Sequence, residues 1–169
     1  MTEKDEVKFR QLILPHFEAA FNLARWLTKS EVDASDVLQD ASIKAFRYIN
    51  TMKSEHPRAW FLQIVRNTSY TLLKSKKMYV EMDFENEIED TNPNAEEILS
   101  EHTSALELHE ALNELAVPYR EILILRELEE MSYEEIAEML QVPLGTVMSR
   151  LARGRELLRK KLILKGTKL

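Results

Sequence analysis

Basic side chains gather near the C-terminus, in the stretch SYEEIAEMLQVPLGTVMSRLARGRELLRKKL from Ser132 to Leu162. Residues 144–169 carry eight basic side chains and one acidic side chain, although the whole chain has a net charge of −6. Guanidinium and ammonium groups bind phosphates, and arginine can also bond two acceptors of a guanine at once. The stretch therefore indicates contact with nucleic acid, and it offers no obvious nucleophile or general base.

A second basic block covers residues 44–80, with eight basic side chains and one acidic side chain. Residues 81–101, which follow it, carry nine acidic side chains and no basic ones. Two basic blocks separated by an acidic stretch suggest two surfaces for a polyanion. Taken alone, such charge runs are explained equally well as solvated helix faces.

The C-terminal basic block follows a pattern of two helices. Ser132 and Glu135 have the spacing of a capping box at a helix start. The turn QVPLG follows, and a second helix begins near Pro143 to Thr146. A capped helix, a short turn and a basic second helix predict a helix-turn-helix, whose second helix enters the major groove. An ordinary helical hairpin with a basic tail is the alternative. The candidate DNA-contacting residues on the second helix are Thr146, Met148, Ser149, Arg150, Arg153 and Arg155.

The remaining sequence also predicts helices. Apolar residues recur at helical spacing over Val7–Thr28, with an interruption at Pro15. A polar loop is expected from Lys29 to Ser35, with Ser35 capping a helix over residues 36–49. Pro57 suits the first turn of a helix that ends near Lys76. Further helices are expected over residues 104–115 and 119–130.

Glycine and proline are scarce, at three and five residues, which favours helix throughout. We therefore predict an all-α protein with two small helical domains, residues 1–80 and 102–169. The segment 81–101 is predicted to be a flexible acidic linker because it lacks apolar periodicity.

Several classes of function are excluded or disfavoured. The chain has no cysteine, and the four histidines (His16, His56, His102 and His109) have no partners at metal-ligand spacing. No glycine-rich phosphate loop appears. No apolar run is long enough to span a membrane, and the N-terminus lacks the apolar core of a signal peptide. We expect a cytoplasmic protein that is not an enzyme and needs no metal or cofactor.

The stretch LRELEEMSYEEIAEMLQVPLGTVMSRLARGRELL resembles region 4 of the extracytoplasmic-function (ECF) sigma factors. These bacterial transcription initiation factors belong to the sigma-70 superfamily. DASDVLQDASIKAFRYI is similar to their region 2.2, and PRAWFLQIVRNTSYTLLKSKK to regions 2.3 and 2.4. The resemblance covers nearly the whole chain, and both motifs occur in the family's order.

The resemblance implies that region 2 binds RNA polymerase core and the melted −10 element of promoter DNA. It implies a polymerase-facing surface of Asp36, Gln39, Asp40 and Lys44. Asn67 becomes the candidate reader of a flipped base, since its amide both donates and accepts hydrogen bonds. Trp60 is either a stacking platform or, at helical spacing with Ile64, a core residue, and its spacing favours the core. The candidate −10 residues are Trp60, Arg66, Asn67, Lys74, Lys76 and Lys77.

The resemblance also implies that the second helix of the helix-turn-helix reads the −35 element as duplex. Thr146, Ser149, Arg150 and Arg153 match the family's contact positions. Met148 departs from the arginine or lysine common there; methionine can pack against a thymine methyl but cannot bond guanine strongly. Gly154 replaces a common alanine, which should weaken the helix slightly.

The family further implies that an anti-sigma factor holds the protein inactive and that the acidic linker runs towards the RNA exit path. The charge of the linker suggests that it keeps the unassembled protein off DNA. Two alternatives stay open. One is a self-sufficient helix-turn-helix regulator whose first domain dimerises. The other is a sigma mimic that titrates an anti-sigma factor without contacting DNA.

Overall fold

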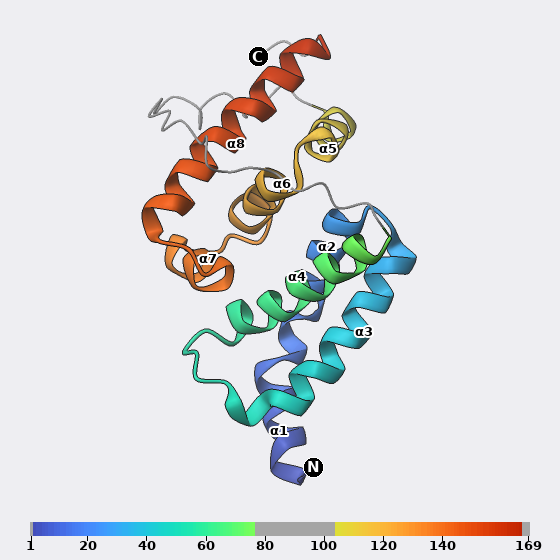
Figure 1. Cartoon of the computed structure of the whole chain (residues 1–169), viewed down its shortest axis with the longest axis vertical. Helices are drawn as coiled ribbons and strands as arrows, with labels where there is room; N and C mark the ends of the chain where they lie inside the picture. The colour runs from blue at the N-terminus through green and yellow to red at the C-terminus, as the bar shows by residue number, and fades with distance from the viewer. Residues whose placement is uncertain (1, 77–103, 167–169) are drawn as a thin grey trace. The chain divides into compact units, whose positions relative to one another are not determined.

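The computed structural model describes residues 2–76 and 104–166, and every regular element in these ranges is a helix (Figure 1). By their contacts, the described residues form two compact units. The first contains residues 2–76 and the segment Glu134–Gln141, and the second contains residues 104–133 and 142–166. The predicted all-α class is confirmed. The predicted linker, residues 81–101, and Lys77 lie outside the described residues.

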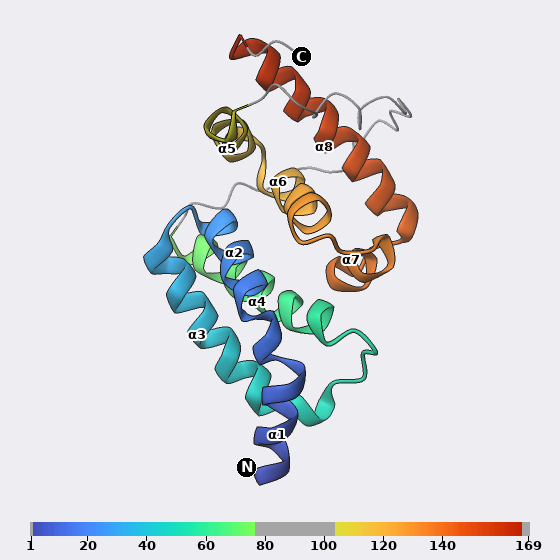
Figure 2. The same cartoon turned by 180° about the vertical axis from the view of Figure 1, so that it is seen from behind.

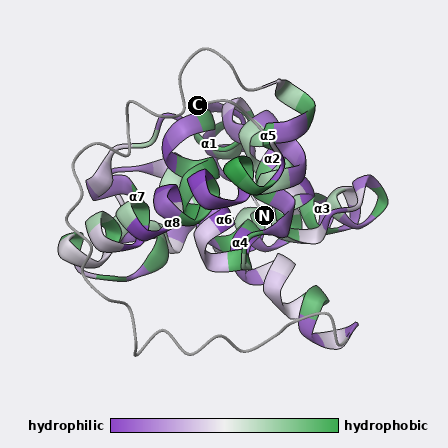
Figure 3. Ribbon diagram, turned by 90° about the horizontal axis from the view of Figure 1, so that it is seen from above, coloured by the Kyte–Doolittle hydropathy of each residue, from purple (hydrophilic) through white to green (hydrophobic). Residues whose placement is uncertain are grey.

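Three helices of the first unit, α2, α3 and α4, pack against one another, and they lie side by side in both views (Figures 1 and 2). The predicted break at Pro15 is confirmed, because a 3-10 turn separates α1 from α2. Each helix presents both hydrophobic and hydrophilic residues (Figure 3). The elements are α1 (Glu3–Leu12), the 3-10 turn Leu14–His16, α2 (Phe17–Thr28), α3 (Glu31–Tyr48), the 3-10 turn Ile49–Thr51 and α4 (Pro57–Ser75).

Aromatic rings join the four helices of the first unit. Phe9 of α1 meets Phe46 of α3 edge to face, with ring centroids 5.4 Å apart. It also meets Phe17 of α2 edge to face at 6.1 Å. Phe17 in turn stacks on Phe61 of α4 at 5.6 Å, and Phe61 is fully buried. Such pairs add stability beyond their burial of apolar area and fix the helices relative to one another.

The start of α3 differs from the sequence prediction. The expected loop from Lys29 to Ser35 is wrong, since α3 begins at Glu31 and Ser30 is its N-cap. The Ser30 hydroxyl accepts a hydrogen bond from the Asp33 amide at 3.2 Å. The first turn of α3 looked like a loop because it is mostly solvent-facing, and Ala34 is its first buried residue.

In the second unit, α8 packs against α6 and α5 (Figure 1). The elements of the C-terminal part of the chain are α5 (Ala105–Glu114), α6 (Val117–Leu123), the π-helical turn Ile124–Leu128, α7 (Tyr133–Leu140) and α8 (Leu144–Leu164). The core is mainly aliphatic, and its α8 members are Val147, Leu151, Leu158 and Leu162.

Gly154 is a buried residue of α8 that faces α6. A Cβ atom built there would meet the Leu123 side chain at 3.4 Å and the Tyr119 carbonyl oxygen at 3.6 Å. Both distances are ordinary van der Waals contacts, so alanine fits without displacing a neighbour. Two ion pairs between α8 and α5 support this packing: Lys165 Nζ lies 2.6 Å from Glu114 Oε1 and 3.6 Å from Glu110 Oε2.

The helix expected over residues 119–130 is present as α6 followed by a π-helical turn, which the sequence did not indicate. The Glu129 amide donates to the Ile124 carbonyl, five residues earlier, at 3.0 Å. Near this segment, Arg120 is only 2% exposed, and its Nη1 donates to the carbonyls of Asn113 and Leu115, each at 3.2 Å. These bonds satisfy carbonyls at the end of α5 that a helix leaves without partners.

Candidate nucleic-acid interface

The predicted helix-turn-helix segment consists of two helices joined by a short turn. α7 ends at Leu140, and Gln141 adopts a left-handed backbone with φ of 55°. Pro143 is the N-cap residue of α8, which begins at Leu144. The predicted capping box of Ser132 and Glu135 remains a prediction.

The N-terminal half of α8 presents most of the predicted DNA-contacting residues outward. Val147, at the centre of this half, is buried and fixes which side of the helix faces inward. Met148 is 53% exposed. The Ser149 hydroxyl donates to the Thr146 carbonyl at 3.2 Å, so both residues lie on one exposed turn. The partly exposed residues of this half include Thr146, Ser149, Arg150 and Arg153.

Arg153 is held by an acidic neighbour on the same helix. Its Nη1 lies 3.1 Å from Glu156 Oε2, and Lys160 Nζ lies 2.9 Å from Glu156 Oε1. One carboxylate therefore neutralises part of the charge of two cations on this face. The spacings of three and four residues place all three side chains on one side of α8.

Arg155 lies apart from the other predicted contacts. It is 8% exposed, and its Nη2 and Nε donate to Glu127 Oε1 at 2.7 and 3.2 Å. Glu127 belongs to the π-helical turn, so this pair ties α8 to that turn. The structure thus gives Arg155 a packing role and does not bring it onto the exposed face with Arg153.

On α4, three of the predicted −10 residues share one stripe. Trp60, Asn67 and Lys74 are spaced by seven residues, which is nearly two helical turns. Asn67 and Lys74 are exposed, and Trp60 is partly exposed. The intermediate exposure of Trp60 leaves both interpretations of it open, as a core residue and as a stacking platform, whereas Trp26 of α2 is buried.

The other cations of α4 have intramolecular contacts. The Arg66 guanidinium lies over the Tyr70 ring, 4.5 Å from its centroid, which is a cation–π arrangement. Lys76 Nζ lies 2.8 Å from both carboxylate oxygens of Asp33, a residue of α3. Lys76 therefore faces α3, while Lys74 faces outward.

The predicted polymerase-facing residues occupy one exposed side of α3. Asp36, Gln39 and Asp40 are exposed. Lys44 is also exposed, and its Nζ donates to Thr68 Oγ1 of α4 at 3.2 Å, so it bridges the two helices. The polar side of α3 is therefore separate from its buried side, which includes Val37 and Ala41.

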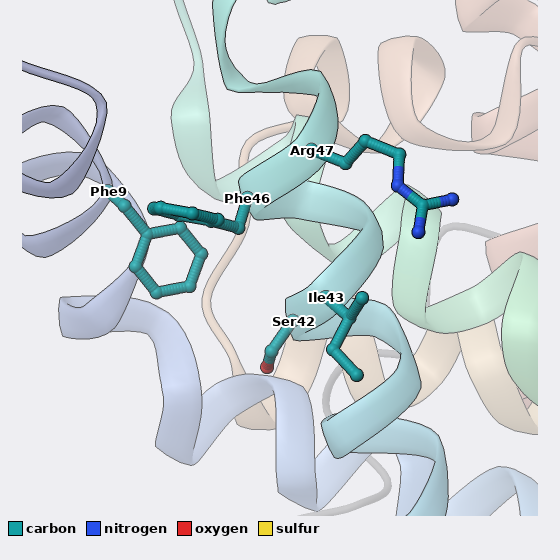
Figure 4. A pocket seen from close by; sticks show the side chains of 5 residues that line it. All are labelled: Phe9, Ser42, Ile43, Phe46 and Arg47. Atoms are coloured by element: carbon teal, nitrogen blue, oxygen red, sulfur yellow. The ribbon is translucent and has the colours of Figure 1, made fainter. Parts of the chain in front are cut away.

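A hollow of about 590 Å³ lies between α1 and the second half of α3. Figure 4 shows Phe46 directed at Phe9, with Arg47 directed away from both. Ile43, which also lines the hollow, is 54% exposed on the outer side of α3. The apolar lining adds a non-polar border to the charged side of α3.

The acidic partners of the predicted cations are Glu156, Asp33 and Glu127. Glu156 could have been found, because three- and four-residue spacing on a helix signals ion pairs. Asp33 and Glu127 could not, since they come from other elements and are 43 and 28 residues from their partners. Within the described ranges, no helix is long and apolar enough for a membrane span, and no three histidine or acidic side chains gather as metal ligands would.

Two family models match the chain. The model described as Sigma-70 region 2 matches residues 12–78. The model described as Sigma-70, region 4 matches residues 105–158. The first match therefore includes α2, α3 and α4, and the second extends from α5 into α8.

Relatives extend the match to most of the chain. The RNA polymerase sigma factor SigV of Bacillus subtilis is 34% identical over 148 residues, which cover 87% of this chain and 86% of the relative. The ECF RNA polymerase sigma factor SigE of Mycolicibacterium smegmatis is 30% identical over 152 residues. That match covers 88% of this chain but spans only 59% of the relative's length.

A solved structure shares the fold. The sigma factor RpoE from Bartonella quintana, crystallised with the anti-sigma factor NepR, superposes with a TM-score of 0.70 at 24% identity. The match covers 91% of this chain and 96% of that one. With both region models and a relative matched along nearly its whole length, the chain belongs to the extracytoplasmic-function sigma factors of the sigma-70 family.

Proposed function

We propose that this chain binds RNA polymerase core and directs it to one class of promoters. It reads the −10 element as a melted strand through α4 and the −35 element as duplex through α8. The observation that carries the proposal is the pair of outward-facing stripes on these two helices, in the two segments that match sigma-70 regions. The protein acts in the cytoplasm, where polymerase and promoter DNA are found.

At the −10 element, the exposed Asn67 amide reads the edge of an unstacked base. Trp60, partly exposed on the same stripe, provides a ring for stacking, as proteins that hold single strands use aromatic side chains. Lys74 contacts a phosphate. Arg66, supported by the Tyr70 ring, contacts a neighbouring phosphate.

At the −35 element, Arg150 and Arg153 read base edges in the major groove, and Thr146 and Ser149 contact bases or phosphates. Met148 lies exposed beside them. Its thioether packs against a thymine methyl, so the preferred −35 sequence carries a thymine at the position that Met148 meets. Arg155 is left out of this contact set because it is buried against Glu127.

The exposed acidic and polar side of α3 binds the polymerase core. Asp36, Gln39 and Asp40 project from it, and Lys44 lies at its border with α4. An anti-sigma factor keeps the protein inactive by covering these surfaces. Two structures with this fold, RpoE with NepR and CnrH with the cytosolic domain of CnrY, support this part of the proposal.

The decisive experiment combines the full chain with bacterial core polymerase and a library of promoter fragments, followed by sequencing of the transcripts. Transcription from promoters with one shared pair of −10 and −35 elements supports the proposal. An Asn67→Ala variant should lose discrimination at one −10 position, whereas Thr71→Ala, at an exposed neighbouring position of α4, should keep it.

Two other outcomes identify the alternatives. Tight duplex binding without polymerase, together with no transcription in its presence, would establish a self-sufficient regulator. Binding to an anti-sigma factor with neither transcription nor DNA binding would establish a sigma mimic. Either result would overturn the proposed function.

A further inference from the structure

One acidic residue interrupts the basic face of α8. Glu156 is the single acidic side chain among residues 144–169, against eight basic ones. It lies one turn beyond Arg153 and one turn before Lys160. Its position continues the face that carries the proposed −35 contacts, where an acid repels the phosphates of any duplex.

The carboxylate is engaged on both sides. Glu156 Oε2 contacts Arg153 Nη1 at 3.1 Å, and Oε1 contacts Lys160 Nζ at 2.9 Å. Its side chain is 18% exposed, compared with 34% for Arg153 and 55% for Lys160. The acid therefore lies beneath the two cations, which are the more solvent-accessible members of the cluster.

This arrangement has two physical consequences. The cluster presents a net charge of +1 where the two cations alone would present +2, so it releases fewer counterions when it meets a phosphate backbone. The contact also uses one of the five N–H donors of the Arg153 guanidinium and so holds the group in place. The other donors, which lie in a fixed planar arrangement, remain for DNA. The restraint favours one direction of approach over the many that a mobile arginine samples.

We propose that Glu156 is a positioning and specificity-determining residue, which lowers affinity for arbitrary duplex and orients Arg153 for its base in the −35 element. The proposal rests on the proposed function of α8. A correct −35 element offers Arg153 a base edge. The guanidinium bonds this edge either in place of Glu156 or together with it. An incorrect element offers only phosphates, and there the partly exposed carboxylate still opposes binding.

The plainer explanation is that Glu156 only stabilises the helix. Pairs spaced by three and four residues contribute about 0.2–0.5 kcal/mol each to an isolated helix. A purely structural role predicts a small change in melting temperature on neutralisation and no change in promoter discrimination. DNA binding as a function of salt therefore separates the two explanations.

The experiment uses holoenzyme assembled from core polymerase and the full chain. The probes are a promoter from the transcript library and the same promoter with a scrambled −35 element, each titrated over a range of salt concentrations. Glu156→Gln should raise affinity for the scrambled probe roughly three- to tenfold near 0.1 M salt and steepen its salt dependence by about one phosphate contact. Affinity for the intact promoter should rise less, so the discrimination ratio falls.

Two further variants complete the test. Glu110→Gln makes the same charge change on α5, where Glu110 pairs with Lys165, and should leave the discrimination ratio unchanged. Glu156→Asp keeps the charge on a shorter side chain and should restore most of the ratio. A Glu156→Gln ratio equal to that of the unmodified chain, with or without a shift in melting temperature, would overturn the inference alone. An unmodified holoenzyme that does not distinguish the two probes would overturn both the inference and the −35 assignment.

Discussion

The two proposed DNA-reading helices, α4 and α8, differ in where their acidic partners originate. At the C-cap of α4, Lys76 is held by Asp33 of the neighbouring α3, and this pair joins two helices. On α8, Arg153 and Lys160 are held by Glu156 of the same helix. The acidic partner of Lys76 therefore lies on α3, at a junction between two helices, whereas the acidic partner on α8 lies on the face proposed to meet DNA.

The number of basic side chains in a segment therefore does not show how many of them are available to bind DNA. Residues 44–80 and 144–169 have the same net charge of +7. Yet Lys74 is exposed, Lys76 faces α3, and Arg155 is buried in a salt bridge with Glu127. A cation fixed by packing contributes to folding, while an exposed cation contributes to association.

The largest expected effect separates Arg153 from Arg155. Arg153→Ala should weaken discrimination of the −35 element by roughly tenfold to a hundredfold, the range for loss of one arginine–base contact, with little change in melting temperature. Arg155→Leu should destabilise the protein and leave discrimination of the −35 element nearly unchanged. It keeps apolar packing but removes a charge-assisted pair, and should lower the free energy of unfolding by roughly 1.5–3 kcal/mol.

Promoter binding by the holoenzyme and thermal unfolding of the full chain measure the two effects. If Arg155→Leu abolished −35 discrimination without destabilising the protein, the proposed division between the two arginines would fail.

Met148→Arg should change which −35 sequence is preferred. An arginine at this exposed position can bond guanine where methionine packs against a thymine methyl, so guanine should replace thymine at one position, with a discrimination of roughly tenfold. Promoter-library transcription measures the change. Ile163→Arg is the matched control, because it adds the same charge at a half-exposed position near the end of α8 and should leave the preference unchanged.

Gly154 within α8 and Gly166 just beyond its C-terminus should respond to substitution by alanine in opposite directions. Gly154→Ala should stabilise the protein by about 0.5–1 kcal/mol, because Ala favours helix and the site admits a Cβ. Gly166→Ala should destabilise it by about 1 kcal/mol, since Gly166 has a positive φ of 78°. Chemical denaturation measures both, and equal signs would contradict the packing described for α8.

The smallest expected effect is the pH dependence of the ion pair between α5 and α8. The hydrogen bond from Lys165 lowers the pKa of Glu114 below its usual 4.5, and the bond to Glu114 raises the pKa of Lys165 above 10.5. The stabilisation from Glu114 is present above pH 4.5 and is lost as pH falls through its folded-state pKa. The stabilisation from Lys165 is present below pH 10.5 and is lost above it.

Lys165→Met should therefore lower the melting temperature slightly at neutral pH, and the difference from the unmodified chain should vanish in acid below the pKa of Glu114. Melting temperatures of both proteins across the pH range provide the measurement. A difference that stays constant into strong acid would show that the pair does not contribute through its charges.

The prediction of secondary structure succeeded where periodicity was strong. The long apolar repeats of α4 and α8, and the proline at the start of α4, correctly predicted where these helices lie. It failed at the start of α3, where the first turn faces solvent and carries no apolar repeat. It also missed the π-helical turn at Ile124–Leu128, because one inserted residue barely disturbs an apolar pattern.

The sequence by itself determined the all-α class and the two basic helices, because these follow from local spacing, charge and a motif along one segment. It also placed Glu156 next to Arg153 and Lys160 in helical spacing. Only the tertiary structure decided that Arg155 is buried against Glu127, that Lys76 meets Asp33 and that Gly154 faces Leu123 of α6. These contacts join residues far apart in the chain, and packing between helices, which no local pattern encodes, brings them together.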